Sequence, residues 1–142
     1  MRCCIASLLL VVAALASGGG ARAADLVVVV NPGSGVDSLG RDDVINIFMG
    51  RYRKFASGLT AIPVDSVARD KAEFYRALVG KELAEINGYW ARLMFSGQAS
   101  PPRQVERAEE VVDIVAGNKG AIGYVERRLV DGRVKIVYGF SP

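Results

Sequence analysis

Short aliphatic runs alternate along this chain with longer segments in which apolar residues recur every three or four positions. The run at 26–30 is unbroken, mostly β-branched and followed by Asn-Pro-Gly, which predicts a buried strand. The same reasoning predicts further strands at 60–64, 120–125 and 134–138 and helices at 40–50, 68–80, 81–95 and 107–116. Strands that alternate with helices predict a layered α/β fold, with a largely parallel or mixed sheet flanked by helices. In the helix at 81–95, the side chains expected to face inward are those of Leu83, Ile86, Trp90, Leu93 and Met94.

The stretch 62–78 begins as a short strand and continues as a helix, and the rest of the chain is organised around it. Pro63 disfavours a central, fully hydrogen-bonded strand position. Asp65 and Ser66 are both favourable N-cap residues. A helix start leaves backbone N–H groups free, and its dipole favours negative charge. With the Ser66 hydroxyl and the Arg69 guanidinium nearby, this junction is a candidate cradle for an oxyanion. The alternative is that Asp65 or Ser66 only caps the helix and that Arg69 is solvated.

The first residues have the features of a signal peptide. Arg2 precedes an apolar run at 5–16, and Ala-Arg-Ala at 21–23 matches a cleavage site, so we expect residues 1–23 to be removed. The remaining 24–142 would then form one exported domain, with an uncleaved N-terminal anchor as the alternative. Both cysteines, Cys3 and Cys4, lie in the leader, and the chain has no histidine. Disulfides, thiol catalysis and Cys/His metal sites are therefore excluded for the mature chain.

Charge and motifs argue against several functional classes. Loss of the two leader arginines, with no acid, lowers the net charge from +3 to +1, which gives no reason to expect nucleic acid as a partner. The glycines after the first strand complete neither nucleotide-binding motif, because Ser38 and Arg41 stand where those motifs need glycine and lysine. The acids paired at 42–43 and 109–110 suit helix starts better than a catalytic dyad. We expect a protein that is not an enzyme and has no cofactor; a hydrolase survives only if its nucleophile is hidden.

Five segments together resemble the phosphate-binding proteins of the high-affinity phosphate ABC transporter. They are Val-Val-Val-Val-Asn-Pro at 27–32, Ser-Leu at 38–39, Ile-Phe-Met-Gly at 47–50, Ser-Val-Ala-Arg at 66–69 and Gly-Ala-Ile-Gly-Tyr-Val at 120–125. The resemblance covers about residues 26–138. It implies a single lobe of a type 2 periplasmic-binding-protein-like fold, corresponding to the second lobe of that family.

The resemblance also implies the residues of a ligand site. Ser66, Val67, Ala68 and Arg69 stand where the family has its Ser-Gly-Thr-Arg phosphate loop, and Asn31, at the end of the hinge strand, is a further contributor. Val67 replaces the glycine that permits close backbone approach, and Ala68 replaces a threonine hydroxyl. The first lobe of the family's clamp has no counterpart here.

Magnitudes set the expected strength of binding. Three charge-assisted contacts on a half-exposed face would total about 4 kcal/mol, which corresponds to a millimolar dissociation constant. We therefore expect weak binding of phosphate or a similar small anion, in phosphate uptake or sensing, unless a homodimer or another protein supplies the second wall. The alternative is an interaction module that docks on a membrane sensor or transporter without a tight ligand of its own. Its distinguishing features would be the altered loop and the basic stretch Arg-Tyr-Arg-Lys at 51–54.

Overall fold

The computed structural model describes residues 23–140. Its elements, in chain order, are η1 (Ala23–Asp25), β1 (Leu26–Val30), α1 (Arg41–Phe48), β2 (Ile62–Asp65), α2 (Ala68–Val79), α3 (Leu83–Phe95), β3 (Arg103–Gln104), α4 (Glu109–Gly117), β4 (Ala121–Glu126), η2 (Arg127–Leu129) and β5 (Lys135–Gly139). The expected signal peptide lies almost entirely outside the described residues. None of the described helices is long and apolar enough to cross a membrane.

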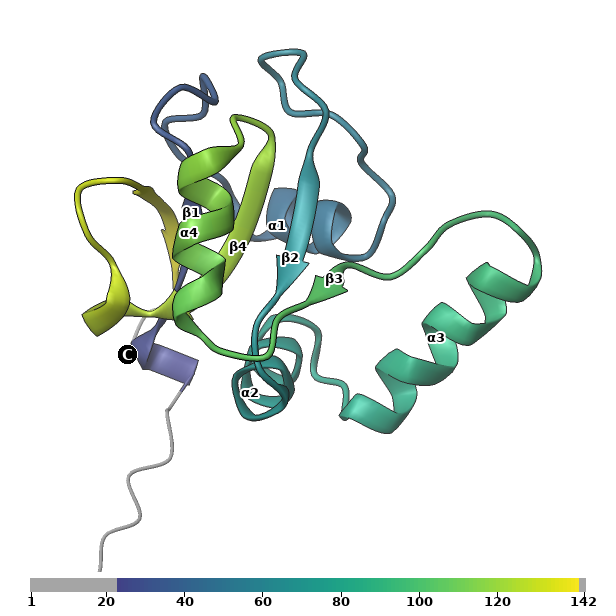
Figure 1. The fold of residues 1–142 in the computed structure, drawn as a ribbon. Coiled ribbons are helices and arrows are strands. Elements are labelled where there is room, and N and C mark those ends of the chain that lie inside the picture. The colour runs from purple at the N-terminus through teal and green to yellow at the C-terminus, as the bar shows by residue number, and fades with distance from the viewer. Residues whose placement is uncertain (1–22, 141–142) are drawn as a thin grey trace, which may run out of the picture.

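The five strands form one open sheet in the order β3-β2-β4-β1-β5 (Figure 1). β2 runs parallel to both β3 and β4, whereas β1 is antiparallel to β4 and to β5. The sheet is therefore mixed, and half of its pairings are antiparallel. The expected layered α/β fold with a mixed sheet is confirmed. Of the two sheet types expected, the largely parallel one is not formed, because β1 lies antiparallel to both of its neighbours.

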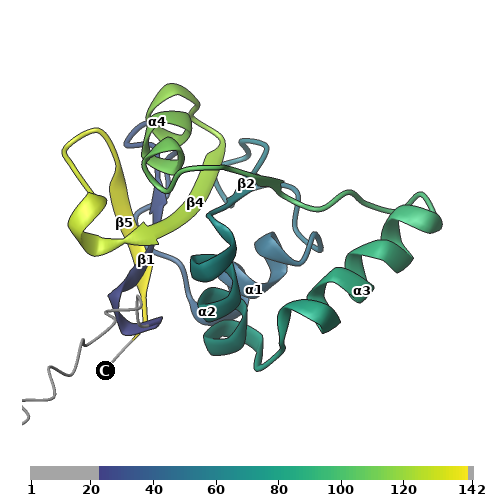
Figure 2. The same ribbon diagram turned by 60° about the horizontal axis from the view of Figure 1, so that its bottom comes forward.

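The sheet separates two hydrophobic cores. All five residues of β1 are buried, and their side chains alternate between the two faces. Val28 packs in the core that includes residues of α1, α2 and α3, while Val29 packs in the core under α4. In Figure 2, α4 lies on one side of the sheet and α1 and α2 on the other, and Figure 1 shows α3 projecting past the edge strand β3. A Cβ at Gly123 would lie 2.5 Å from a methyl group of Val111, so glycine permits the close approach of α4 to β4.

Most of the expected elements are confirmed, with bounds shifted by one to two residues at most ends. α2 ends as expected at Gly80, whose φ of 68° is left-handed and suits glycine. One expectation fails in α3. Met94 is 56% exposed, because the end of α3 extends beyond the body of the domain. The two-residue strand β3, which follows the loop after α3, was not predicted.

The parallel strands bring three chain segments to one edge of the sheet. β3 begins opposite Val64, so Pro63 has a strand partner on the β4 side only, in agreement with its expected effect. β2, β3 and β4 all end at the same edge, which places Asp65 and Glu126 close to the start of α2. Ligands of α/β sheets favour such carboxyl ends.

Candidate functional site

The first turn of α2 begins directly after β2, at the carboxyl edge of the parallel strands. Residues 66–70 of this segment are here called the α2 turn. The N-cap residue is Val67, and no side chain caps the helix start among the described residues. The expectation that Asp65 or Ser66 caps α2 is therefore wrong. The N-cap is one residue later, the Ser66 hydroxyl donates to the side chain of Asp70, and the Asp65 carboxylate accepts from two tyrosine hydroxyls.

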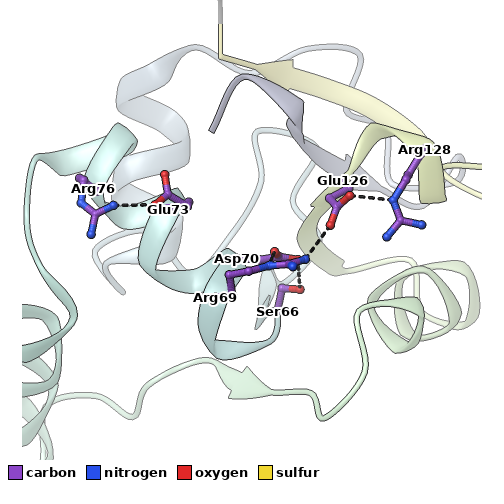
Figure 3. A network of polar contacts seen from close by, with 7 residues as sticks. All are labelled: Ser66, Arg69, Asp70, Glu73, Arg76, Glu126 and Arg128. Atoms are coloured by element: carbon purple, nitrogen blue, oxygen red, sulfur yellow. Dashed lines mark hydrogen bonds and ion pairs between the residues drawn. The ribbon is translucent and has the colours of Figure 1, made fainter. Parts of the chain in front are cut away.

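The α2 turn already holds anionic oxygens, and they belong to the chain itself (Figure 3). Asp70, the third residue of the helix, is fully buried, and its Oδ2 accepts a hydrogen bond of 3.3 Å from the Ser66 hydroxyl. Arg69 Nε lies 3.4 Å from Asp70 Oδ1. A carboxylate at this position complements the helix dipole, as a bound anion would.

A second carboxylate comes from the end of β4. Arg69 Nη2 donates to Glu126 Oε1 at 3.0 Å, and Arg128 Nε donates to Glu126 Oε2 at 2.7 Å. The side chain of Arg69 is 56% exposed, while that of Glu126 is only 13% exposed. The cation that sequence reasoning assigned to a ligand is thus shared between Asp70 and Glu126 (Figure 3).

Of the five residues expected to bind a ligand, the structure brings four together. The α2 turn contains Ser66, Val67, Ala68 and Arg69. Asn31 lies at the opposite end of the strands. Val30 pairs with Ile122 near the start of β4, while Leu26 pairs with Glu126 at its end.

The amide group of Asn31 is fully engaged at that opposite end. Its Nδ2 donates to the carbonyl oxygens of Val115 and Ala116, both at 3.0 Å, and its Oδ1 accepts from the Gly33 N–H at 2.8 Å. Asn31 therefore hydrogen-bonds to carbonyl groups at the C-terminal end of α4 and is not placed to reach a ligand at the α2 turn.

Sequence reasoning missed a buried polar cluster behind the α2 turn. The Asp65 carboxylate is fully buried, and its Oδ1 accepts hydrogen bonds from the hydroxyls of Tyr75, at 2.9 Å, and Tyr124, at 3.0 Å. Its Oδ2 lies 3.5 Å from Lys71 Nζ, an ion pair that has no well-aligned hydrogen bond. The spacing of Lys71 and Tyr75, one helical turn apart, is the signal that could have indicated part of this cluster.

Burial sets the protonation of the cluster. Desolvation raises the pKa of Asp65 above 3.8, and the charge of Lys71 opposes that rise. Desolvation, followed by the nearby Asp65 charge, raises the pKa values of Tyr75 and Tyr124 well above 10.0, so both hydroxyls remain donors at neutral pH. The cluster fixes the end of β2 against α2 and β4, and so supports the α2 turn.

Comparison with solved structures identifies the fold. An ABC-type phosphate transport receptor from Vibrio cholerae is 18% identical, with a TM-score of 0.60 over 80% of this chain and 45% of the receptor. A putative phosphate ABC transporter substrate-binding protein with bound phosphate, from Clostridium perfringens, is 17% identical, with a TM-score of 0.60 over 80% of this chain and 44% of that protein. A possible phosphate binding protein from Planctomyces limnophilus DSM 3776 is 16% identical, with a TM-score of 0.57 over 82% of this chain and 42% of that protein.

These matches confirm the expected fold. The chain has the fold of one lobe of a phosphate-binding receptor of the ABC-transporter type, and it spans less than half the length of the proteins that it matches. No family model matches the chain, and no curated protein matches it in sequence. Because fold alone does not fix function, the role of this lobe depends on its own site.

Proposed function

We propose that this chain is an exported, receptor-like lobe that works by docking on a protein partner, such as a membrane transporter or sensor of phosphate uptake. In this proposal, any phosphate or similar oxyanion that it binds at the α2 turn is held weakly. The observation that carries the proposal is the occupation of that turn by Asp70 and Glu126, two carboxylates of the chain itself. The function best supported is therefore that of an interaction module and not of a high-affinity receptor.

The reason is competition between the chain's own carboxylates and a bound anion. To bind phosphate, Arg69 would have to leave Glu126 and Asp70, and the Ser66 hydroxyl would have to leave Asp70. The hydrogen bonds formed with phosphate would only replace these bonds, with little net stabilisation. The phosphate would then lie close to two carboxylates, and like charges about 4 Å apart near a protein surface repel by about 4 kcal/mol. That repulsion equals the whole free energy of millimolar binding, about 4 kcal/mol.

Phosphate titration of the purified protein, followed by backbone amide shifts of the α2 turn, tests the weak-binding part. We expect no saturation below roughly 1 mM phosphate, and only small shifts at about 10 mM. Arg69→Ala is the informative variant. Arg76→Ala is the matched control, because Arg76 is also a paired, exposed arginine of α2 but lies two turns from its start. Micromolar saturation that is lost in Arg69→Ala and kept in Arg76→Ala would contradict the proposal.

Photo-crosslinking in living cells tests the docking part. A photoreactive residue is placed in turn at exposed positions around the domain, and each adduct is identified by mass spectrometry. We expect one face to give a discrete adduct with a subunit of a membrane transporter or sensor. The absence of adducts from every position would contradict the docking part of the proposal.

A homodimer that closes the α2 turn is the second candidate, and Arg69 is the feature that favours it. Its side chain is more than half exposed despite its two ion pairs, so a second molecule could contact it directly. Sedimentation with and without about 10 mM phosphate distinguishes the two candidates. Phosphate-dependent dimers, lost in Arg69→Ala, would favour a receptor completed by a second copy.

A further inference from the structure

A hollow of about 450 Å³ lies beside α3, and none of its lining residues belongs to the α2 turn. It is bounded by the segment that follows α1, by the start of β2 and by the loop that follows α3. Trp90, only 4% exposed, lines it, and we call it the Trp90 hollow. Gly50 has a φ of 76° and contacts the indole so closely that a Cβ there would lie 2.9 Å from Trp90 Cη2, which holds the ring in place.

The walls of the Trp90 hollow combine apolar and polar groups. Tyr52, from the segment after α1, and Met94, from α3, both line it and are 50% and 56% exposed, respectively. The Trp90 indole N–H is buried and has no acceptor among the described residues. Protein interfaces are enriched in tyrosine, tryptophan, methionine and arginine relative to the remaining surface. The composition of this hollow is therefore that of an interface centre.

The charge around the Trp90 hollow is positive and unbalanced. Arg53 lines the hollow, and its Nη2 donates to the Gln98 carbonyl oxygen at 2.7 Å, which holds the guanidinium at the rim. Lys54 follows it, while Arg51 and Arg92 line the next hollow together with one acid, Glu85. Within residues 23–140, none of these four cations forms an ion pair. An acidic partner would supply the missing charge.

We propose that the Trp90 hollow docks an acidic segment of a protein partner, with one apolar side chain of that segment inserted between Tyr52 and Met94. The proposal rests on the docking function proposed above and assigns its surface. The acids of the segment pair with Arg53 and its basic neighbours, and the apolar side chain covers Trp90. A concave site with a basic rim fits an inserted side chain better than the flat surface of a membrane.

The single tryptophan of the chain makes the test direct, because Trp90 fluorescence reports on the hollow itself. The probe is a capped, ten-residue peptide with one phenylalanine flanked by glutamates, titrated into the purified protein. We expect a saturable fluorescence change that weakens as salt is added. Arg53→Glu and, separately, Tyr52→Ser should weaken binding about tenfold. Arg127→Glu is the control, because Arg127 is exposed, lies near Gly139 of the edge strand β5 and does not line the hollow.

Four outcomes would overturn the assignment. A peptide with lysines in place of the glutamates could bind equally well, or benzoate alone could bind equally well. The protein could bind only to vesicles that contain anionic lipid, or it could be a dimer that the substitutions dissociate. Failure here is distinguishable from failure of the docking function. If the peptide does not bind while crosslinks form from another face, the domain docks elsewhere; if no crosslink forms from any face, docking itself is rejected.

Discussion

The α2 turn and the Trp90 hollow both present an exposed arginine, but only one of these arginines is neutralised. Arg69 is shared between Asp70 and Glu126, whereas Arg53 is held by a carbonyl oxygen and has no ion-pair partner among residues 23–140. A neutralised cation must lose its partners before it can bind a ligand, so binding is weak. A cation without an ion pair can attract an acidic partner without first losing another contact. The comparison shows that the chain's own carboxylates neutralise the cation of the α2 turn, whereas Arg53 at the Trp90 hollow has no ion pair among residues 23–140.

The largest effect is expected from Asp70→Ala, which would open the α2 turn. The change leaves the buried Ser66 hydroxyl without its partner and the helix start without its carboxylate, so we expect a loss of about 2–3 kcal/mol in the free energy of unfolding. Phosphate should then partly replace the missing anion. In urea denaturation, about 10 mM phosphate should stabilise the variant more than the wild type, because binding to the folded state adds to its stability.

Asp42→Ala is the matched control for that experiment. Asp42 lies in the first turn of α1 but is exposed, so its removal should change the free energy of unfolding by only about 0.5 kcal/mol. Equal stabilisation of the wild type and Asp70→Ala by phosphate would mean that Asp70 does not compete with the anion, and the contrast between the two regions would be lost.

A smaller effect is expected from Asp65→Asn, because asparagine keeps the acceptor for the two tyrosine hydroxyls. The folded-state pKa of Asp65 is raised above 3.8, so its contribution to stability is present below about pH 3.8 and is lost as pH rises through the raised value. As pH rises from about 3.8 through the raised pKa of Asp65, the wild type should therefore lose stability relative to Asp65→Asn. Free energies of unfolding measured from about pH 4 to pH 8 check the sign. A difference that is constant or reversed would show that Lys71 compensates the buried charge fully.

Sequence patterns were sufficient for most of the fold and for the position of the α2 turn. The β-branched run of β1 and the apolar spacing of α2 are local signals, and both elements formed where they were expected. Local sequence signals could not predict the placement of Asn31. It depended on whether β1 runs parallel or antiparallel to β4, which strand composition does not encode.

The state of the α2 turn could not be predicted for a similar reason. Asp70 was visible as an acid in the first helical turn, but its burial against Ser66 depends on tertiary packing. Glu126 reaches Arg69 from 57 residues further along the chain. The sequence placed Arg69 at the α2 turn but could not show which carboxylates neutralise it.

The smallest effect on stability is expected where the charge change is largest, at Arg53→Glu. No ion pair of Arg53 is lost among the described residues, and its hydrogen bond to the Gln98 carbonyl is exposed, so the free energy of unfolding should change by less than about 0.5 kcal/mol. The variant also reduces repulsion among the adjacent cations at 51–54, which offsets part of that loss. Thermal denaturation at low and high salt, with Arg127→Glu as the control, measures this balance. A loss above about 1 kcal/mol would mean that Arg53 stabilises the fold, and its positive charge would then need no partner to explain it.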